Sequence, residues 1–493
     1  MELQADRGEF CMTKGKVYFV GAGPGDVGLI SVKGQKAIEK ADIILYDRLL
    51  NPKLLEAATL DCELIYCGKT PYTNGITQGE INGLLVSKAL AGHRVVRLKG
   101  GDPSVFGRVG EEAESLKDAG IPFEVIPGVT SSIAASMYAG VPVTHRDYGR
   151  SFAMVTGHDQ TKKDMDWNGL VKSIDTVAFY MGVANLPYIR ENLINHGKPV
   201  NTPALVIQWG TYGRQESVEG TLDDIVERVS ERSLGNPAIT LVGDIISLRG
   251  KLQWFEKKPL FGQRFLVART GTAKSSLAET LDELGGEVIE FPKWNAAKVK
   301  IDESQLLSFL LYDRILFTSP ESVHGFLDSL TEHAIDFRRI SSKLYVLSRK
   351  SKKALQQRGL MAELKSEMSD TGTLLVVGDR NRDQRDPAYG DGDYFQLVDK
   401  FVDERFLEIL PRMLDGKSVG TVLFSNRHSV DILMQYGKKA DVDVEGLLNQ
   451  ASIGVIGEST GNRLKDYGFT LDMMPKEPSV EQLVELILNR NVF

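Results

Sequence analysis

The stretch Val17–Asp26 (VYFVGAGPGD) decides the fold of the first half of this chain. Its apolar start, Val17–Val20, is typical of a buried strand, and the glycine-rich turn after it predicts a tight loop. A helical pattern at Ser31–Lys40 and a second apolar run at Ala41–Tyr46 come next. Because a strand, a helix and a strand in this order usually form a parallel unit, we predict a parallel sheet covered by helices.

The same alternation continues and predicts two lobes in the first half. Helices are expected at Gly110–Ala119, Leu186–His196 and Leu222–Ser233, and the second region opens near Val177 and closes near Arg249. We therefore expect lobes at about 15–150 and 151–255. The further strands are predicted at Arg94–Leu98, Phe123–Ile126, Val177–Met181, Ala204–Gln208 and Ala238–Val242.

A polar, proline-containing connector at 256–261 predicts a boundary between two halves. A new strand and helix series then opens with Phe265–Arg269, which indicates a second domain at 262–493. Within it, Ile315–Ser319 is echoed by Val422–Asn426, each a strand followed by a polar turn and a helix. Two copies favour a pair of similar lobes rather than a solenoid, which needs more repeats.

The bulk composition excludes several classes of protein. The chain has 493 residues, which is enough for about three folding units. A net charge of -7 provides no basic field for nucleic acid, so no nucleic-acid partner is expected. No run approaches the roughly 20 apolar residues of a membrane span, and the polar start at 1–14 is predicted to be a disordered extension rather than a signal peptide.

The three cysteines are Cys11, Cys62 and Cys67. An odd and sparse set fits a reducing compartment, so we expect a cytoplasmic protein. Cys62 and Cys67 lack the paired histidines or cysteines that zinc requires, so no metal site is predicted and small buried thiols are the favoured interpretation.

The first glycine loop has a dinucleotide-binding alternative. A glycine-rich turn follows the strand, and Asp47 stands about 20 residues later, as in a Rossmann fold. However, Asp26 replaces the third glycine and would repel a pyrophosphate, and Pro24 removes a backbone N–H donor. A purely structural turn is the second alternative, and a loop for a ligand without phosphates is favoured over both.

An ordered set of motifs at 16–250 resembles the uroporphyrinogen-III C-methyltransferases. Each motif alone is common, but the ordered set is specific. The motifs are Gly21–Asp26, Tyr46–Leu49, Gly68-Lys69, Val96–Pro103, Phe106–Arg108, Ile126–Ser131, Pro142–Arg146, Val155–His158, Tyr180–Gly182 and Gly210-Thr211. Val109 departs from the family, which often has glycine there.

The resemblance implies a two-lobed tetrapyrrole methylase fold of α/β class, with S-adenosylmethionine in the cleft between the lobes. It also implies that Asp47 accepts a proton, that Lys69 donates one, and that the enzyme forms a homodimer through this half. The cofactor-binding residues that it implies are Pro24, Gly100, Gly101, Asp102, Val105, Thr130, Ser131, Met181 and Gly210.

Physical reasoning agrees with these roles and keeps simpler alternatives open. Glycines permit close backbone approach to a ligand without phosphates, and loss of a proton after C-methylation needs a nearby base such as Asp47. Yet Asp47 is also a plausible helix N-cap, Lys69 a solvated lysine and Met181 a core residue.

The family's substrate carries eight carboxylates, which makes arginines reasonable partners. The alternative for each is an ordinary surface ion pair. The candidate arginines are Arg97, Arg108, Arg146 and Arg150.

Residues 262–493 resemble uroporphyrinogen-III synthase through weaker motifs. The family folds as two flavodoxin-like lobes, which implies one lobe at 262–293 plus 402–493 and an inserted lobe at 294–401. The synthase is a lyase that closes hydroxymethylbilane without a cofactor. The motifs are Phe265–Arg269, Phe317–Val323, Phe424–Asn426, Ile456–Gly461 and Pro478–Val484.

Hydroxyls at strand ends are the candidate substrate contacts of this second half, although simple helix capping is the alternative for each. The candidates are Thr318, Ser319, Ser425 and Thr460. Two departures, Val346–Arg349 in place of a family motif and Phe401 in place of a tyrosine, leave a catalytically inactive binding module as the alternative. The combined prediction is an enzyme that makes uroporphyrinogen III and methylates it twice to precorrin-2.

Overall fold

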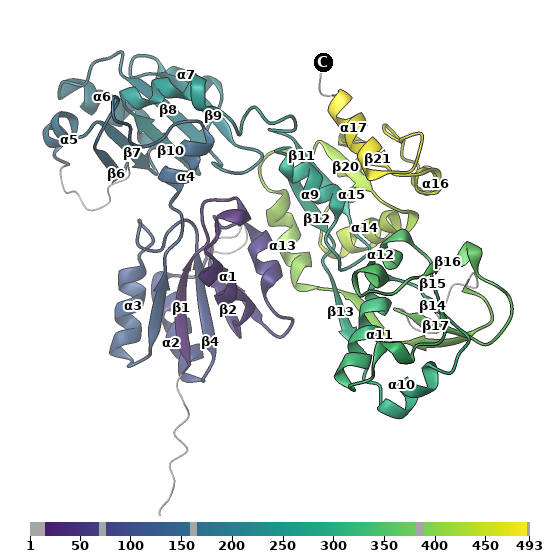
Figure 1. Cartoon of the computed structure of the whole chain (residues 1–493). Coiled ribbons are helices and arrows are strands. Elements are labelled where there is room, and N and C mark those ends of the chain that lie inside the picture. The colour runs from purple at the N-terminus through teal and green to yellow at the C-terminus, as the bar shows by residue number, and fades with distance from the viewer. Residues whose placement is uncertain (1–14, 69–74, 158–164, 380–388, 491–493) are drawn as a thin grey trace, which may run out of the picture.

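A computed structural model describes residues 15–68, 75–157, 165–379 and 389–490. Within these ranges the strands form four sheets of four or five strands and one two-stranded ribbon. Figure 1 shows the first half of the chain beside the second half, with one helix, α13, lying between them. The predicted extension at 1–14 and Lys69 lie outside the described residues.

The first sheet is entirely parallel and has the order β3-β2-β4-β1-β5. All four residues of β2 are buried, as is typical of an inner strand of a parallel sheet. Its strands are β1 (Lys16–Gly21), β2 (Ile43–Tyr46), β3 (Glu63–Tyr66), β4 (Arg94–Lys99) and β5 (Phe123–Ile126). Its helices are η1 (Val27–Leu29), α1 (Val32–Glu39), η2 (Pro52–Ala57), α2 (Gln78–Leu90) and α3 (Val109–Asp118).

The second sheet has the order β6-β7-β10-β8-β9 and is mixed, because only β6 and β7 run parallel. Its strands are β6 (Phe152–Thr156), β7 (Thr176–Tyr180), β8 (Pro203–Gln208), β9 (Glu216–Thr221) and β10 (Ala238–Val242). Its helices are α5 (Trp167–Ser173), η3 (Val183–Asn185), α6 (Leu186–Asn195), α7 (Ile225–Glu231), η4 (Asp244–Leu248) and α8 (Arg249–Leu252). Helix α4 (Ser131–Tyr138) also packs here, since Ala135 and Ala139 share a core with Ile207 and Leu241.

The second half begins with a parallel sheet of order β12-β11-β20-β21. Its strands come from both ends of this half, so the lobe is discontinuous in sequence. The strands are β11 (Arg264–Ala268), β12 (Glu287–Phe291), β20 (Thr421–Phe424) and β21 (Ser452–Val455). The helices are α9 (Ser276–Glu283), α13 (Arg405–Leu414), α14 (Arg427–Lys439), α15 (Val444–Gln450), α16 (Glu458–Asp466) and α17 (Val480–Arg490).

The other lobe of the second half is a parallel sheet of order β16-β15-β14-β17-β18. An antiparallel ribbon of β13 (Trp294–Lys298) and β19 (Val398–Val402) connects the two lobes. The strands are β14 (Arg314–Phe317), β15 (Lys343–Val346), β16 (Glu363–Leu364), β17 (Leu374–Gly378) and β18 (Asp393–Gln396). The helices are α10 (Glu303–Phe309), α11 (Pro320–Glu332), η5 (Phe337–Arg339), α12 (Arg349–Gln357) and η6 (Lys365–Glu367). The predicted α/β class is confirmed in all four lobes.

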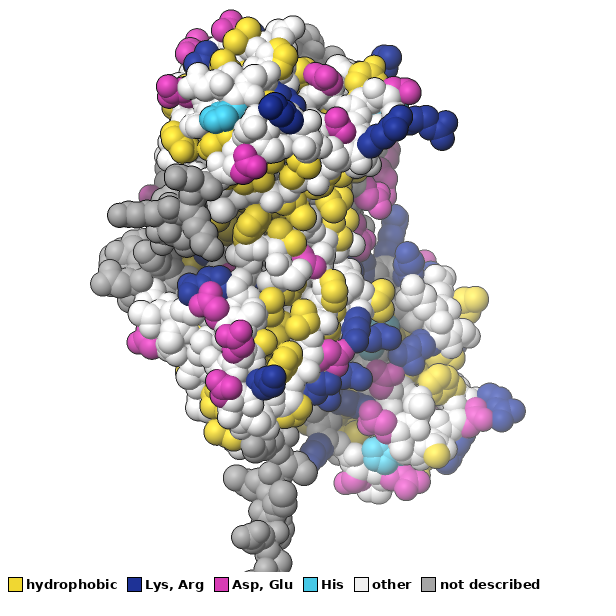
Figure 2. Space-filling model, turned by 90° about the vertical axis from the view of Figure 1, so that its left-hand side faces the viewer, with side chains coloured by type: hydrophobic (Ala, Val, Ile, Leu, Met, Phe, Trp, Pro, Cys, Tyr) yellow, Lys and Arg dark blue, Asp and Glu magenta, His cyan; other side chains and the backbone are white. Residues whose placement is uncertain are grey.

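The face of the first half that points away from the second half carries edge strands β5 and β6. Figure 2 looks onto this side and shows hydrophobic side chains gathered along its middle. Exposed apolar residues of β5, α4 and β6 are Phe123, Val125, Ile133, Met137 and Met154.

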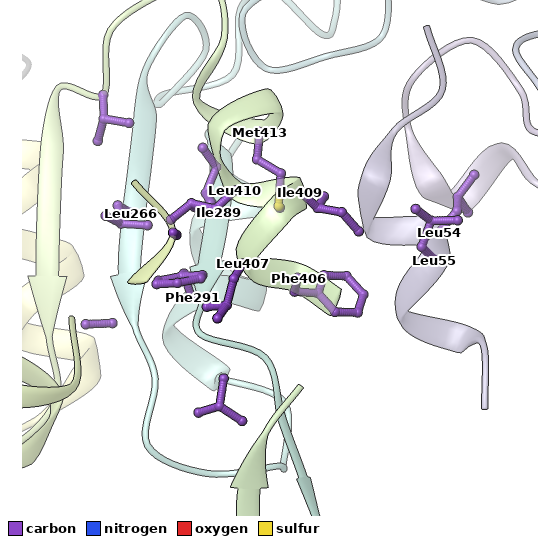
Figure 3. Close-up of a cluster of buried hydrophobic side chains, with 14 of the residues drawn as sticks. Leu54, Leu55, Leu266, Ile289, Phe291, Phe406, Leu407, Ile409, Leu410 and Met413 are labelled. Carbon is purple, nitrogen blue, oxygen red and sulfur yellow. The ribbon is translucent and has the colours of Figure 1, made fainter. Parts of the chain in front are cut away.

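The two halves share a hydrophobic core rather than meeting at a polar boundary. One cluster of buried residues contains Leu54 and Leu55 of the first half together with Phe406, Ile409 and Met413 of α13 (Figure 3). The predicted connector is also packed, because Leu260 is fully buried and Glu256 accepts hydrogen bonds from Gln215 and Ser217 at 2.7 and 2.6 Å. This packing fixes how the halves are arranged.

Candidate active sites

The glycine loops after β1 and β4 are joined to each other at the carboxyl edge of the first sheet. Gly101 N–H donates to the Gly23 carbonyl at 2.8 Å, and Gly23 N–H donates to the Gly101 carbonyl at 3.2 Å. Both glycines have φ near +70°, the left-handed conformation that favours glycine (φ 76° and 67°). A Cβ added at Gly101 would meet no atom closer than 3.9 Å, so a group of methyl size can approach this backbone without a clash.

Asp102 ties these loops to the next strand end. Its carboxylate accepts hydrogen bonds from Gly128 N–H at 2.9 Å and from Ser104 N–H at 2.7 Å. These bonds hold the segment Gly100–Asp102, which the sequence predicts to bind cofactor. Pro24 precedes Gly25, whose carbonyl accepts from the Asn51 side chain at 2.8 Å, so the first glycine loop is anchored as well.

Thr130 and Ser131 lie at the start of α4, where the two lobes meet. The Thr130 hydroxyl is 2.7 Å from the hydroxyl of Tyr180, which stands at the end of β7 in the other lobe. Tyr180 also accepts a hydrogen bond from Ser132 N–H at 2.9 Å. The phenol of Tyr180 therefore holds the start of α4 against the end of β7, beside the predicted cofactor residues. No sequence pattern indicated this role.

The second lobe brings Met181 and Gly210 to the same region. Met181 is 48% exposed with a φ of 55°, which excludes the alternative of a plain core residue. At Gly210 an added Cβ would lie 2.2 Å from the Ala135 Cβ, so only glycine fits against α4 there. Val105, from the loop after Asp102, is partly buried.

Asp47 follows β2 and forms part of a buried chain of charges. Its Oδ1 lies 2.6 Å from Arg97 Nη2, and Arg97 Nε lies 3.3 Å from Glu112 Oε1. Lys99 Nζ reaches the same Glu112 oxygen at 2.8 Å. Asp47 remains 32% exposed whereas Arg97 is almost fully buried, so only the Asp47 end of the chain faces solvent. Asn51, not Asp47, caps the following helix, which removes the N-cap alternative for Asp47.

The charged groups around Arg97 shift one another's pKa values. Burial opposes the positive charge of Arg97, but Asp47 and Glu112 outweigh it and raise the pKa of Arg97. Burial and the neighbouring Arg97 lower the pKa of Lys99, while Glu112 opposes that shift. Arg97 is therefore a permanent cation that pairs with the Asp47 carboxylate.

Sequence reasoning missed Glu112, although a signal exists. Glu112 lies four residues before the buried Leu116 on the inner face of α3, where a carboxylate needs a charged partner. The fully buried Glu112 finds two, Arg97 and Lys99.

The predicted substrate arginines are not gathered in one place. Arg97 belongs to the buried chain, and Arg108 forms an exposed ion pair with Glu111 at 2.6 Å. Arg146 and Arg150 are exposed on the segment that leads into β6, and Arg150 N–H donates to Asp175 at 2.8 Å.

The candidate residues of the second half lie at strand ends in both of its lobes. Thr318 and Ser319 follow β14, and Ser319 caps α11 by accepting from Ser322 N–H at 3.1 Å. Ser425 follows β20 and is exposed, while the neighbouring Asn426 caps α14. Thr460 is buried within the first turn of α16. The capping alternative therefore holds for Ser319 and is excluded for Ser425.

Neither a cluster of metal ligands nor a helix suited to span a membrane occurs in the described part of the chain. No group of three or more potential metal ligands occurs among those residues. None of the helices described there is long and apolar enough to cross a membrane.

Comparisons with known proteins agree with the two halves. The family model described as Tetrapyrrole (Corrin/Porphyrin) Methylases matches residues 16–226, and that of Uroporphyrinogen-III synthase HemD matches residues 275–384. The crystal structure of the uroporphyrin-III C-methyl transferase of Thermus thermophilus with S-adenyl homocysteine is 36% identical and covers 48% of this chain and all of its own, with a TM-score of 0.42.

Two relatives cover most of this chain. The Porphyrin biosynthesis protein HemD of Ruminiclostridium josui is 37% identical over 373 residues, which are 74% of each chain. The Uroporphyrinogen-III C-methyltransferase of Bacillus subtilis is 44% identical over 462 residues, which are 93% of this chain and 95% of that protein. With the ordered motifs and the two-lobed α/β first half, this similarity shows that the chain belongs to the uroporphyrinogen-III C-methyltransferase family, in a form fused to a uroporphyrinogen-III synthase domain.

Proposed function

We propose that this chain converts hydroxymethylbilane to uroporphyrinogen III with its second half and methylates that product twice, to precorrin-2, with its first half. The proposed methylation is supported chiefly by the position of Asp47. Its carboxylate pairs with the buried Arg97 near the edge of the first sheet that carries Gly100 and Gly101. Similarity to a C-methyltransferase over 93% of the chain supports the assignment.

The residues of the first half fit S-adenosylmethionine as the methyl donor. Gly100 and Gly101 leave space beside their backbone, and the loop at Pro24 and Asp26 is unsuited to phosphates. When bound, this cofactor supplies a methyl group already activated by its sulfonium. The predicted cofactor residues would hold it between the lobes, where Tyr180 joins the end of β7 to the start of α4.

The chain's own residues then perform two tasks. The cleft holds a pyrrole carbon against the methyl group, because alignment supplies much of the rate of such a transfer. Asp47 then accepts the proton that the methylated carbon must lose, and Arg97 orients the Asp47 carboxylate through their ion pair. We assign Lys69 as the proton donor from the family motif alone.

The second half would work without a cofactor by holding a linear tetrapyrrole between its two lobes. Thr318 and Ser319 in one lobe, and Ser425 and Thr460 in the other, follow strand ends where hydroxyls and backbone N–H groups can bind carboxylates. An inactive, substrate-binding second half is the alternative.

One experiment separates these functions. The purified chain is incubated with hydroxymethylbilane and S-adenosylmethionine, and in parallel with uroporphyrinogen III and S-adenosylmethionine. We expect dimethylated product from both substrates. Methylated product from uroporphyrinogen III but not from hydroxymethylbilane would show that the second half is inactive. The absence of methylated product with both substrates would refute the proposal.

The proton-acceptor role is tested with Asp47→Ala. The variant should bind S-adenosylmethionine with a Kd within about twofold of wild type, while kcat falls roughly 10²–10⁴-fold, as for a lost general base. A kcat equal to that of wild type would remove Asp47 from the mechanism.

We also propose that the enzyme is a homodimer through its first half. Exposed apolar residues of β5, α4 and β6 gather on the face that points away from the second half (Figure 2). Exposed apolar patches and open strand edges are characteristic of protein interfaces. The other partners in the proposal are its tetrapyrrole substrates and products, and neither nucleic acid nor a membrane is one.

The domain limits and location complete the proposal. We place the methyltransferase at 15–255 with lobes at about 15–150 and 151–255, a connector at 256–261, and the synthase at 262–493 with its inserted lobe at 294–401. The strands of each of the four larger sheets fall within one of these proposed lobes, which supports the division. A cytoplasmic location is supported by the free, buried thiols of Cys62 and Cys67.

A further inference from the structure

Helix α13 belongs to the synthase half but is packed on two sides. Figure 3 shows Leu407 and Leu410 directed toward Ile289 and Phe291 of the synthase sheet, and Phe406 and Ile409 directed toward Leu54 and Leu55 of the methyltransferase half. All of these side chains are buried. The helix is therefore part of the interior of both enzymes.

The last turn of α13 places Arg412 against the methyltransferase sheet. Its guanidinium lies 3.9 Å from the ring centroid of Tyr66 and 5.2 Å from that of Tyr46. These two rings, which end β3 and β2, are themselves 5.5 Å apart. Burial raises the pKa of the Tyr46 phenol and Arg412 opposes that rise, which indicates a direct electrostatic interaction.

Each tyrosine leads directly into a segment of the methyltransferase site. Tyr46 is followed by Asp47, which forms the ion pair with Arg97. The Tyr66 hydroxyl lies so close to Gly68 that an added Cβ there would be 2.3 Å from it. Movement of the two rings would therefore move Asp47 and Gly68.

Further contacts fasten the same region to the synthase half. Arg405, in the first turn of α13, donates to the carbonyls of Thr59 and Cys62 at 2.8 Å each, and Lys293 pairs with Glu56 at 2.8 Å. Arg405 attaches the helix, and Lys293 attaches the turn between β12 and β13. Neither side chain has a contact with a tyrosine ring among these bonds, so Arg405 provides a control for the role of Arg412.

We propose that Arg412 is a positioning residue for methyl transfer, acting through Tyr46 and Tyr66 on the segments that carry Asp47 and Gly68. The synthase half thereby completes the scaffold of the methyltransferase site. This inference rests on the proposed role of Asp47 as the proton acceptor.

The test compares Arg412→Ala with Arg405→Ala, which removes the same residue type from the same helix. Loss of Arg412 should lower the kcat of methylation about tenfold, since small misplacements of reacting groups cost up to about 10²-fold. The KM values for S-adenosylmethionine and uroporphyrinogen III should stay within about twofold. Arg405→Ala should keep kcat within about twofold, and Arg412→Lys should recover part of the lost rate because it retains the cation.

Two further measurements separate positioning from loss of folding. Cyclisation of hydroxymethylbilane by the Arg412→Ala chain should remain within about twofold of wild type, since the Arg412 guanidinium lies over the rings of Tyr66 and Tyr46 in the methyltransferase half. Tyr66→Leu removes the aromatic ring that faces the Arg412 guanidinium, and it should reproduce the loss in kcat. If Arg412→Ala does not fold, the kcat values of Arg412→Lys and Tyr66→Leu test the proposal instead. Wild-type kcat in both of these variants would overturn it.

A double-mutant cycle tests the route of the effect. In an Asp47→Ala background, Arg412→Ala should lower the residual rate by clearly less than tenfold, because the part of its effect that passes through Asp47 is then lost. A full tenfold loss there, wild-type kcat in Arg412→Ala, or an equal loss in Arg405→Ala would each overturn the inference. Full activity of Asp47→Ala alone would instead refute the proposed proton acceptor.

Discussion

Asp47 and Arg97, fifty residues apart in sequence, are joined by a 2.6 Å ion pair at the carboxyl edge of the first sheet. The register explains the pairing, because Tyr46 of β2 lies opposite Leu98 of β4 and the two chains run in parallel. Arg97 is held in turn by Glu112, so the orientation of Asp47 depends on a buried contact that reaches into α3.

The first prediction concerns Arg97→Lys. Lysine keeps the charge but lacks the planar fork that reaches Asp47 and Glu112 together. We expect kcat to fall roughly 10- to 100-fold, with the KM for uroporphyrinogen III within about threefold, when steady-state methylation is measured. A tenfold or larger rise in KM with unchanged kcat would instead support the predicted role of Arg97 as a partner of substrate carboxylates.

The glycine that packs against α4 is tested by Gly210→Ala. The new methyl group would lie 2.2 Å from Ala135 Cβ, which forces α4 to shift and costs about 1–3 kcal/mol of unfolding free energy. Affinity for S-adenosylmethionine should fall in isothermal titration. The control is Gly110→Ala in α3, where no atom lies within 4 Å of the added Cβ and helix propensity favours alanine. Equal affinity in both variants would contradict the expectation.

Capping and substrate binding are separated by Ser319→Ala and Ser425→Ala. Ser319 caps α11, so its loss should lower the unfolding free energy by about 1 kcal/mol in urea titrations. Ser425 caps no helix and is exposed, so its removal should leave stability unchanged. If Ser425 binds a substrate carboxylate, its loss raises the KM for hydroxymethylbilane, and an unchanged KM would remove it from the site.

Thiol reactivity should depend strongly on pH. Burial raises the pKa of Cys62 and of Cys67 to about 11, and only the thiolate reacts. In a Cys11→Ser chain we expect slow alkylation by iodoacetamide at pH 8, with the rate rising toward pH 11, and fast alkylation in guanidinium chloride. Because the native thiols keep their protons above the ordinary pKa near 8.5, the unfolded chain binds fewer protons there, and stability falls between about pH 8.5 and pH 11. Rapid labelling of the native chain at pH 8 would show that the thiols are not buried.

The proposed dimer is tested by Phe123→Asp combined with Ile133→Asp. Charges on this exposed apolar face should convert a dimer to a monomer in analytical ultracentrifugation, because a buried carboxylate without a partner is costly. Leu311→Asp, at an 83% exposed position in the synthase half, is the control and should leave the dimer intact. A wild-type chain that sediments as a monomer at micromolar concentration would refute the dimer.

Local patterns were sufficient for the elements with strong hydrophobic signals. The strand at Phe123–Ile126 was predicted with its observed limits, and that at Arg94–Leu98 is one residue longer in the structure. Two edge strands, β3 and β9, were missed because their exposed and polar residues give a weak signal. The helix expected at Leu222–Ser233 begins only at Ile225, since Thr221 and Asp224 form a hydrogen-bonded turn first.

The sequence by itself determined the α/β class, the two fused halves and, through ordered motifs, the family. These properties depend on periodicity and on short motifs, which neighbouring residues specify. Only the tertiary structure decided that Glu112 holds Arg97 against Asp47, that Tyr180 joins the lobes, and that Arg412 reaches Tyr46 and Tyr66 from more than 300 residues away. Such contacts depend on strand order and helix docking, which the whole chain settles by burying its apolar surface and pairing its buried charges.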